Sequence, residues 1–69
     1  MVTEWNDIKA GDILIINKTG IKVTAEMKFR RTINCVWFEG GVLYRKKFRK
    51  WEISTPNGYR DYKLEKVLS

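Results

Sequence analysis

Apolar and polar residues alternate along much of this chain in short runs, a pattern typical of β-strands. The clearest run covers residues 21–29, in which every second residue is apolar and the residues between are polar or charged. A period of two places the apolar side chains on one face of a strand. Residues 13–16 are wholly apolar and largely β-branched, so they predict an earlier strand with Ile13 and Ile15 directed into the core.

Residues 32–48 predict a β-hairpin, which we place at the centre of the sheet. Two runs rich in β-branched and aromatic residues, 32–38 and 42–48, flank a turn that contains Gly40 and Gly41. Glycine suits such a turn because it adopts positive φ without a Cβ clash. Both faces of the first run carry apolar residues, which indicates that this strand is central or that its outer face is covered.

The rest of the chain predicts one more strand and a C-terminal extension. Residues 51–55 favour a short strand, and Pro56 and Gly58 predict a turn after it. Residues 59–69 fit either a returning strand or a short helix. We expect a short strand followed by one helical turn.

These elements predict a single all-β domain over residues 1–69. Four to five short antiparallel strands with tight turns describe a small, partly open barrel of the SH3-like or OB-like type, and the short loops favour the SH3-like type. Residues 1–10 form a lead-in, whose Trp5 and Ile8 we expect across one open end of the sheet, and residues 56–69 form the extension. The predicted core residues are Ile13, Ile15, Ile21, Val23, Ala25, Ile33, Cys35, Trp37, Phe48 and Ile53.

Several motifs between residues 11 and 55 resemble a known family. They are Gly11-Asp12 before an apolar run, Gly20 before Ile21-Lys22-Val23-Thr24, Ile33-x-Cys35-x-Trp37-Phe38, Gly40-Gly41, and Phe48 ahead of Ile53. This set resembles the YodC-like family of small uncharacterised bacterial proteins, in which the Cys-x-Trp-aromatic element is the most specific part. The resemblance implies a small SH3-like β-barrel and no particular activity. Trp51 and residues 56–69 have no counterpart in it.

The composition argues against catalysis and against metal binding. The chain has no histidine, and its one cysteine, Cys35, alternates with Ile33 and Trp37, as a small buried hydrophobic residue would. A lone cysteine forms no disulfide within the chain and, without histidine, provides no zinc ligand set. No carboxylate pair or phosphate-binding glycine loop appears. We therefore expect no enzyme activity, small-molecule substrate, metal or cofactor.

The N-terminal residues and the hydropathy pattern predict a cytoplasmic protein. Residues 1–7 carry acids where a signal peptide would carry bases. No apolar run approaches the ~20 residues that cross a bilayer. We therefore expect no contact with a membrane.

The net charge of +6 on 69 residues predicts attraction to polyanions. Bases gather in residues 28–31 and 45–50, which contain no acid. The second and fourth strands of a meander run in the same direction, so these groups should meet at one rim of the sheet, bordered by aromatic rings that suit nucleic acid. The predicted nucleic-acid-binding residues are Lys28, Arg30, Arg31, Tyr44, Arg45, Lys47, Arg49, Lys50 and Trp51.

The clustered bases also fit two further roles. They could bind an acidic protein, or they could keep an edge strand from pairing with other chains. A competing hypothesis concerns Val36, Phe38 and Leu43, which should face outward from the hairpin. An apolar patch on a small domain often marks a protein interface, so a homodimer or another protein partner would account for it. Coverage of the patch by Trp5 or by the C-terminal tail would account for it equally well.

Overall fold

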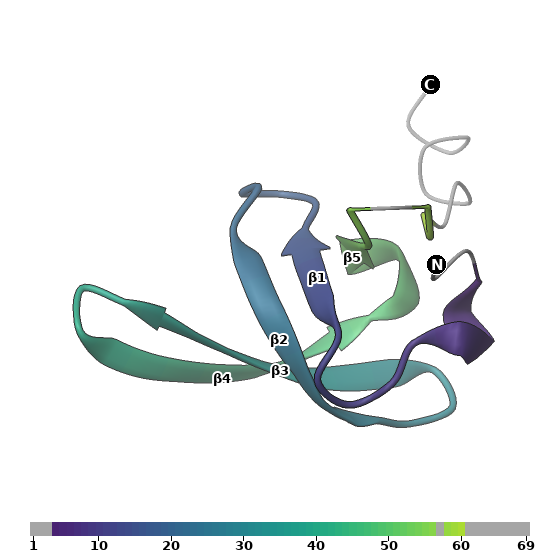
Figure 1. Ribbon diagram of the computed structural model, residues 1–69, viewed down its shortest axis with the longest axis horizontal. Helices are drawn as coiled ribbons and strands as arrows, with labels where there is room; N and C mark the ends of the chain where they lie inside the picture. The colour runs from purple at the N-terminus through teal and green to yellow at the C-terminus, as the bar shows by residue number, and fades with distance from the viewer. Residues whose placement is uncertain (1–3, 57, 61–69) are drawn as a thin grey trace.

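The computed structural model describes residues 4–56 and 58–60 and shows an all-β domain (Figure 1). Five antiparallel strands form one open sheet, and this small SH3-like, partly open barrel confirms the predicted fold class. The only helical elements among the described residues are two 3-10 turns, η1 and η2. The elements are η1 Trp5–Asp7, β1 Ile13–Ile16, β2 Lys22–Lys28, β3 Thr32–Glu39, β4 Val42–Arg49, η2 Lys50–Glu52 and β5 Ile53–Ser54.

The predicted hairpin does not lie at the centre of the sheet. The strand order is β4-β3-β2-β1-β5, so β2 is central and β4 is an edge strand. The β3–β4 ladder continues up to the pair Glu39–Val42, and this end of the hairpin extends beyond the other strands (Figure 1). The placement was wrong because a local pattern identifies a hairpin but does not show which strands flank it.

The buried face of β1 is the opposite of the predicted one. Leu14 and Ile16 are buried, whereas Ile13 is 47% exposed and Ile15 is half-buried. Leu14 pairs with Val23 of β2, and directly opposed residues share a face of the sheet. A wholly apolar run has no alternation of its own, so this pairing alone decides which face is buried.

A β-bulge in β2 reverses the alternation of its side chains. Val23 and Ala25 are buried as predicted, but the register with β3 shifts between Ala25 and Met27. Beyond the shift, Met27 is 54% exposed and Phe29 is also exposed. A bulge bends its strand and redirects the side chains after it, so the period of two in residues 21–29 does not correspond to one buried face.

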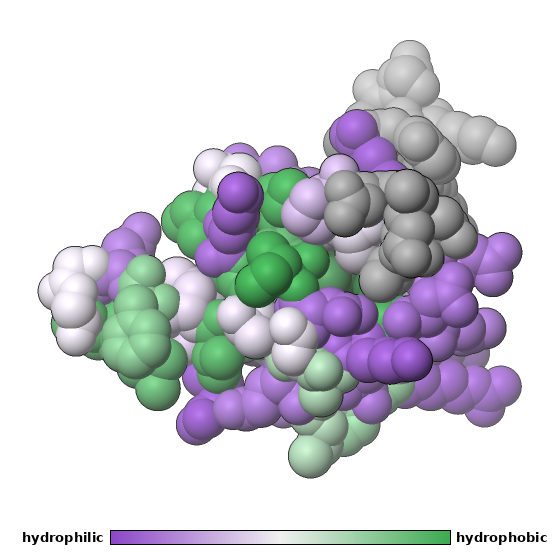
Figure 2. Space-filling view, viewed as in Figure 1, coloured by the Kyte–Doolittle hydropathy of each residue, from purple (hydrophilic) through white to green (hydrophobic). Residues whose placement is uncertain are grey.

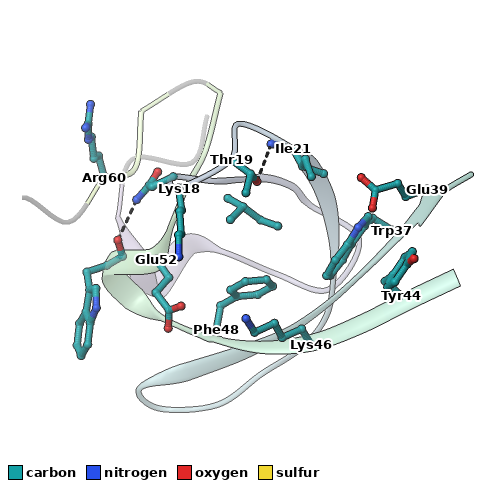
Figure 3. Close-up of a pocket in the computed structure, with 13 residues that line it drawn as sticks. Lys18, Thr19, Ile21, Trp37, Glu39, Tyr44, Lys46, Phe48, Glu52 and Arg60 are labelled. Carbon is teal, nitrogen blue, oxygen red and sulfur yellow. Dashed lines mark hydrogen bonds between the residues drawn. The ribbon is translucent and has the colours of Figure 1, made fainter.

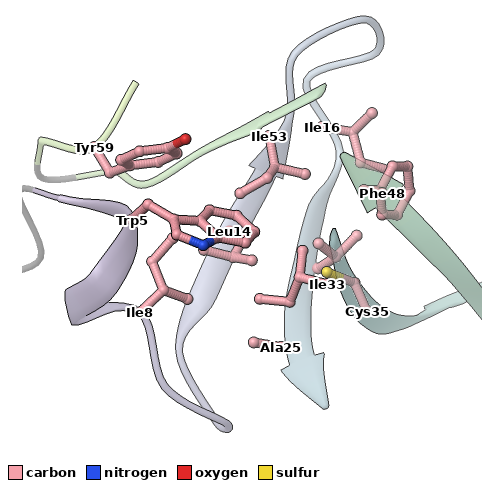
Figure 4. Packing of buried hydrophobic residues seen from close by; sticks show 11 residues of the cluster. Trp5, Ile8, Leu14, Ile16, Ala25, Ile33, Cys35, Phe48, Ile53 and Tyr59 are labelled. Carbon is pink, nitrogen blue, oxygen red and sulfur yellow. The ribbon is translucent and has the colours of Figure 1, made fainter. Parts of the chain in front are cut away.

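The core packs between the sheet and the two terminal segments (Figure 4). Its members that the sequence predicted are Val23, Ala25, Ile33, Cys35, Phe48 and Ile53, with Ile21 and Trp37 partly buried against them. Its members that the prediction lacked are Trp5, Ile8, Leu14, Ile16 and Tyr59.

Both terminal segments contribute to this core. The rings of Trp5 and Tyr59 pack with their centroids 5.9 Å apart. Arg60 forms an isolated antiparallel bridge with Ser54 of β5, so the chain returns along the sheet edge after its turn. The expected C-terminal helical turn falls in residues 61–69, outside the described residues.

Candidate nucleic-acid interface

Bases from separate strands meet at one end of the sheet. β2 and β4 are each antiparallel to β3 and so run in the same direction, and the pairs Lys28–Ile33 and Thr32–Arg49 place their ends at the same level. We call the cations at this end the basic rim. Hydrophilic residues gather over the end of the sheet where β2 turns into β3 (Figure 2). The basic rim consists of Lys28, Arg30, Arg31, Lys47, Arg49 and Lys50.

Trp5 holds three segments of the basic rim together. The Nζ atoms of Lys28 and Lys50 lie 5.6 and 5.5 Å from the centroid of its ring, within the range of a cation–π contact. Its Nε1–H donates to the carbonyl of Arg30 at 3.1 Å, and its own carbonyl accepts from Lys28 Nζ at 3.0 Å. The sequence pattern placed Trp5 at an open end of the sheet and did not reveal this role.

Two other aromatic rings border the basic rim. Lys47 Nζ lies 4.9 Å from the centroid of Phe29, and the guanidinium of Arg49 lies 5.4 Å from that of Trp51. The β-bulge accounts for the first contact, because it leaves Phe29 exposed on the side of the sheet that carries Lys47. The rim thus presents cations already placed against aromatic faces.

Arg45, also predicted to bind nucleic acid, differs from the rim in its electrostatics. Arg45 Nη2 lies 2.9 Å from Glu26 Oε2 in an exposed ion pair. Among residues 4–56 and 58–60, this is the one ion pair within 4.0 Å. The cations of the basic rim therefore pair with no described carboxylate, whereas the charge of Arg45 is locally neutralised.

The inner face of the sheet carries a groove beside the core. It encloses about 760 Å³, within the roughly 300–1,000 Å³ of sites that hold small organic ligands. Figure 3 shows Trp37 and Tyr44 at one end, Glu52 at the other, and Phe48 and Lys46 between them. We call this site the aromatic groove; its lining includes Lys18, Trp37, Glu39, Tyr44, Lys46, Phe48, Trp51 and Glu52.

The predicted binding residues are divided between two faces. Tyr44 and Trp51 line the aromatic groove, while Lys47 and Arg49 alternate with Phe48 and so lie on the outer face of β4. The prediction also lacked Lys46, whose Nζ lies 5.4 Å from the ring centroid of Phe48. Its place in the strand alternation, between Tyr44 and Phe48, is the signal that could have identified it.

The three residues of the alternative protein interface form an apolar patch on the outer face of the hairpin. Phe38 is 74% exposed and lies directly opposite Leu43, and Val36 is half-buried on the same side. Trp5 does not cover this patch, because it is buried beside Tyr59. The tail residues 61–69 lie outside the described structure.

Cys35 is a buried free thiol in the core. Burial raises its pKa to about 11, so the thiol is protonated at neutral pH and is a poor nucleophile. In the described part of the chain, no three side chains of the metal-binding types come together. The absence of catalysis and of a metal stays a prediction.

A helix long and apolar enough to span a membrane is not found among the described residues. No family model, curated protein or solved structure matches this chain. The YodC-like resemblance of residues 11–55 therefore stays a prediction.

Proposed function

We propose that this protein is a small non-catalytic module that binds the phosphates of nucleic acid at its basic rim. The observation that carries the proposal is the convergence at Trp5, where Lys28, Lys50 and the backbone of Arg30 are held in contact with one ring. Cations ordered in advance lose less side-chain entropy when they bind an anion. Lysine and arginine side chains that only contact solvent would not be held against an aromatic ring in this way.

The expected mode of binding is contact with the backbone of the nucleic acid. The helical elements among the described residues are two 3-10 turns, so this part of the chain offers no helix to enter a major groove. Lysine and arginine contacts to phosphate position a protein without reading sequence. We therefore expect weak dependence on base sequence and strong dependence on salt.

The test is a fluorescence-anisotropy titration of labelled single-stranded and duplex oligonucleotides over a range of salt concentrations. If about four phosphates are neutralised, a plot of log affinity against log salt should have a slope of about −3 for single strands and about −4 for duplex. The proposal fails if no oligonucleotide binds more tightly than about 100 µM at low salt, which is the weak end of ordinary non-specific binding.

A second candidate function is a protein contact through the apolar patch of Val36, Phe38 and Leu43. The observation that favours it is the 74% exposure of Phe38 beside Leu43, since exposed apolar clusters of this kind are common at interfaces. Self-association would use the apolar side chains alone, because the bases of two copies repel each other, whereas an acidic protein would use the apolar patch together with the adjacent bases. Light scattering over a concentration series tests the homodimer. A dimer that Phe38→Asp dissolves supports it, and a wild-type monomer at every concentration excludes it.

A further inference from the structure

We infer that the aromatic groove receives an unpaired base of single-stranded nucleic acid while the basic rim holds phosphates farther along the same strand. The inference rests on the proposed function and adds to it the kind of nucleic acid that binds. It follows from the shape of the groove, from its charges and from its connection to the rim.

The groove offers a flat aromatic surface with an open side. Trp37 and Tyr44 stack with their centroids 5.6 Å apart and their planes 16° from parallel. Trp37 is packed against the core, whereas Tyr44 is exposed on the protruding part of the hairpin. A base can therefore stack on Tyr44 without displacing core side chains. Stacking of this kind tolerates any base, because every base has a π face.

The groove offers polar partners for a base beside its aromatic surface. The carboxylates of Glu39 and Glu52 line it together with the aromatic rings, and so do the cations of Lys18, Lys46 and Arg60, so the groove holds charges of both signs. Exocyclic amino groups of bases are donors that carboxylates accept. The ammonium group of Lys46 lies over the ring of Phe48, where it can meet a phosphate of the bound strand.

Arg49 and Trp51 connect the groove to the basic rim. Trp51 lines the groove. The guanidinium of Arg49, which belongs to the basic rim, lies 5.4 Å from the centroid of the Trp51 ring. β4 is the edge strand of the sheet, so no described strand separates its outer face from the groove. A flexible single strand can cross this edge with phosphates on one side and a base on the other. A duplex cannot, because its bases are paired and stacked.

The first experiment uses the wild-type protein and two single-stranded oligonucleotides of equal length, one normal and one made of abasic nucleotides. Both carry the same phosphates, so the basic rim should bind both. We expect the abasic strand to bind at least about tenfold more weakly, the loss of one stacked base. Equal affinities overturn the groove inference and leave the proposed function in place. Failure of both strands to bind overturns the two together.

The second experiment compares Tyr44→Ser with Phe38→Ser, a matched aromatic deletion on the opposite face of the same hairpin. Tyr44→Ser should lower single-strand affinity about tenfold while changing duplex affinity less than about twofold. Phe38→Ser should leave the ratio of the two affinities unchanged. An equal loss for single strand and duplex in Tyr44→Ser, or a change of ratio in Phe38→Ser, contradicts the inference. An unfolding curve of each variant establishes that it is folded.

Discussion

At the scale of single residues, Trp5 joins the core to the basic rim. Its ring is buried and packs against Tyr59. The edge and faces of the same ring meet the carbonyl of Arg30 and the ammonium groups of Lys28 and Lys50. One side chain therefore contributes to stability and to the arrangement of the binding surface.

The two contributions of Trp5 can be separated by substitution. Trp5→Ala should cost about 3–5 kcal/mol, the usual effect of deleting a buried aromatic side chain. Trp5→Phe keeps a ring but removes the Nε1–H donor to Arg30, so it should cost less, with about 0.5–1.5 kcal/mol from the lost hydrogen bond. Urea unfolding followed by circular dichroism measures both. A Trp5→Ala variant with an unchanged midpoint would show that the ring is not part of the core.

Cys35 gives a prediction for alkaline pH. Burial raises its pKa to about 11, from a value near 9 in the unfolded chain. The stability that follows from this shift is complete below pH 9 and is lost between pH 9 and 11, because in that window the unfolded chain releases the thiol proton and the folded chain keeps it.

The measurement is the free energy of unfolding of the wild type and of Cys35→Ala at several pH values. Cys35→Ala lowers stability at every pH through the lost volume, but it should remove the part of the decline between pH 9 and 11 that Cys35 causes. The two proteins differ at position 35 alone, so the difference between the curves isolates the thiol. Parallel curves over the whole range would refute the assignment.

At the scale of elements, the β3–β4 hairpin separates two surfaces of different chemistry. Tyr44, Lys46 and Phe48 alternate along β4 on the side of the groove, and Leu43 and Lys47 lie on the outer side. Because consecutive residues of a strand point to opposite faces, a single segment provides the groove wall, part of the basic rim and part of the apolar patch. The geometry of the hairpin turn therefore matters for all three.

The turn glycines allow a test of this dependence. Gly41 has φ of +79°, and a Cβ atom added there would meet nothing within 4 Å. The cost of a side chain is therefore conformational alone. We expect Gly41→Ala to destabilise the hairpin by about 1 kcal/mol, and Gly41→Asn by less, since asparagine tolerates positive φ. Amide hydrogen exchange in β3 and β4 measures the difference. Equal exchange in the two variants would contradict a purely conformational cost.

At the scale of the whole molecule, the chain has a net charge of +6. Many of its cations are concentrated at one end of the sheet. Position therefore matters as well as total charge. Lys22 and Lys28 stand at opposite ends of β2, roughly 20 Å apart at ~3.3 Å per residue. A phosphate backbone on the rim would not reach Lys22 without extending over most of the sheet.

Charge reversal at matched positions tests the location of the rim. Lys47→Glu and Lys22→Glu change the net charge equally, and both positions are exposed. Lys47→Glu should weaken oligonucleotide binding and reduce the salt slope by about 1, the effect of one lost phosphate contact. Lys22→Glu should leave the slope unchanged. Equal effects of the two variants in the anisotropy titration would mean that total charge, not the basic rim, governs binding.

The fold class and the approximate limits of the strands could be predicted from the pattern of residues along the chain. Strand propensity and turn glycines are local properties, so the runs that became β2, β3 and β4 were recognisable. The convergence of bases from β2 and β4 was also predictable, because it depends only on strand direction in a meander. These features need no knowledge of distant contacts.

Which faces are buried and how the surfaces are divided depends on contacts between segments that are distant in the sequence. The buried side of β1 depends on its pairing with β2, and the exposure of Phe29 depends on a bulge that the alternating pattern does not reveal. Trp5 and Tyr59 meet across more than fifty residues of chain. Register, bulges and long-range packing are properties of pairs of segments, and a pattern within one segment carries no information about its partner.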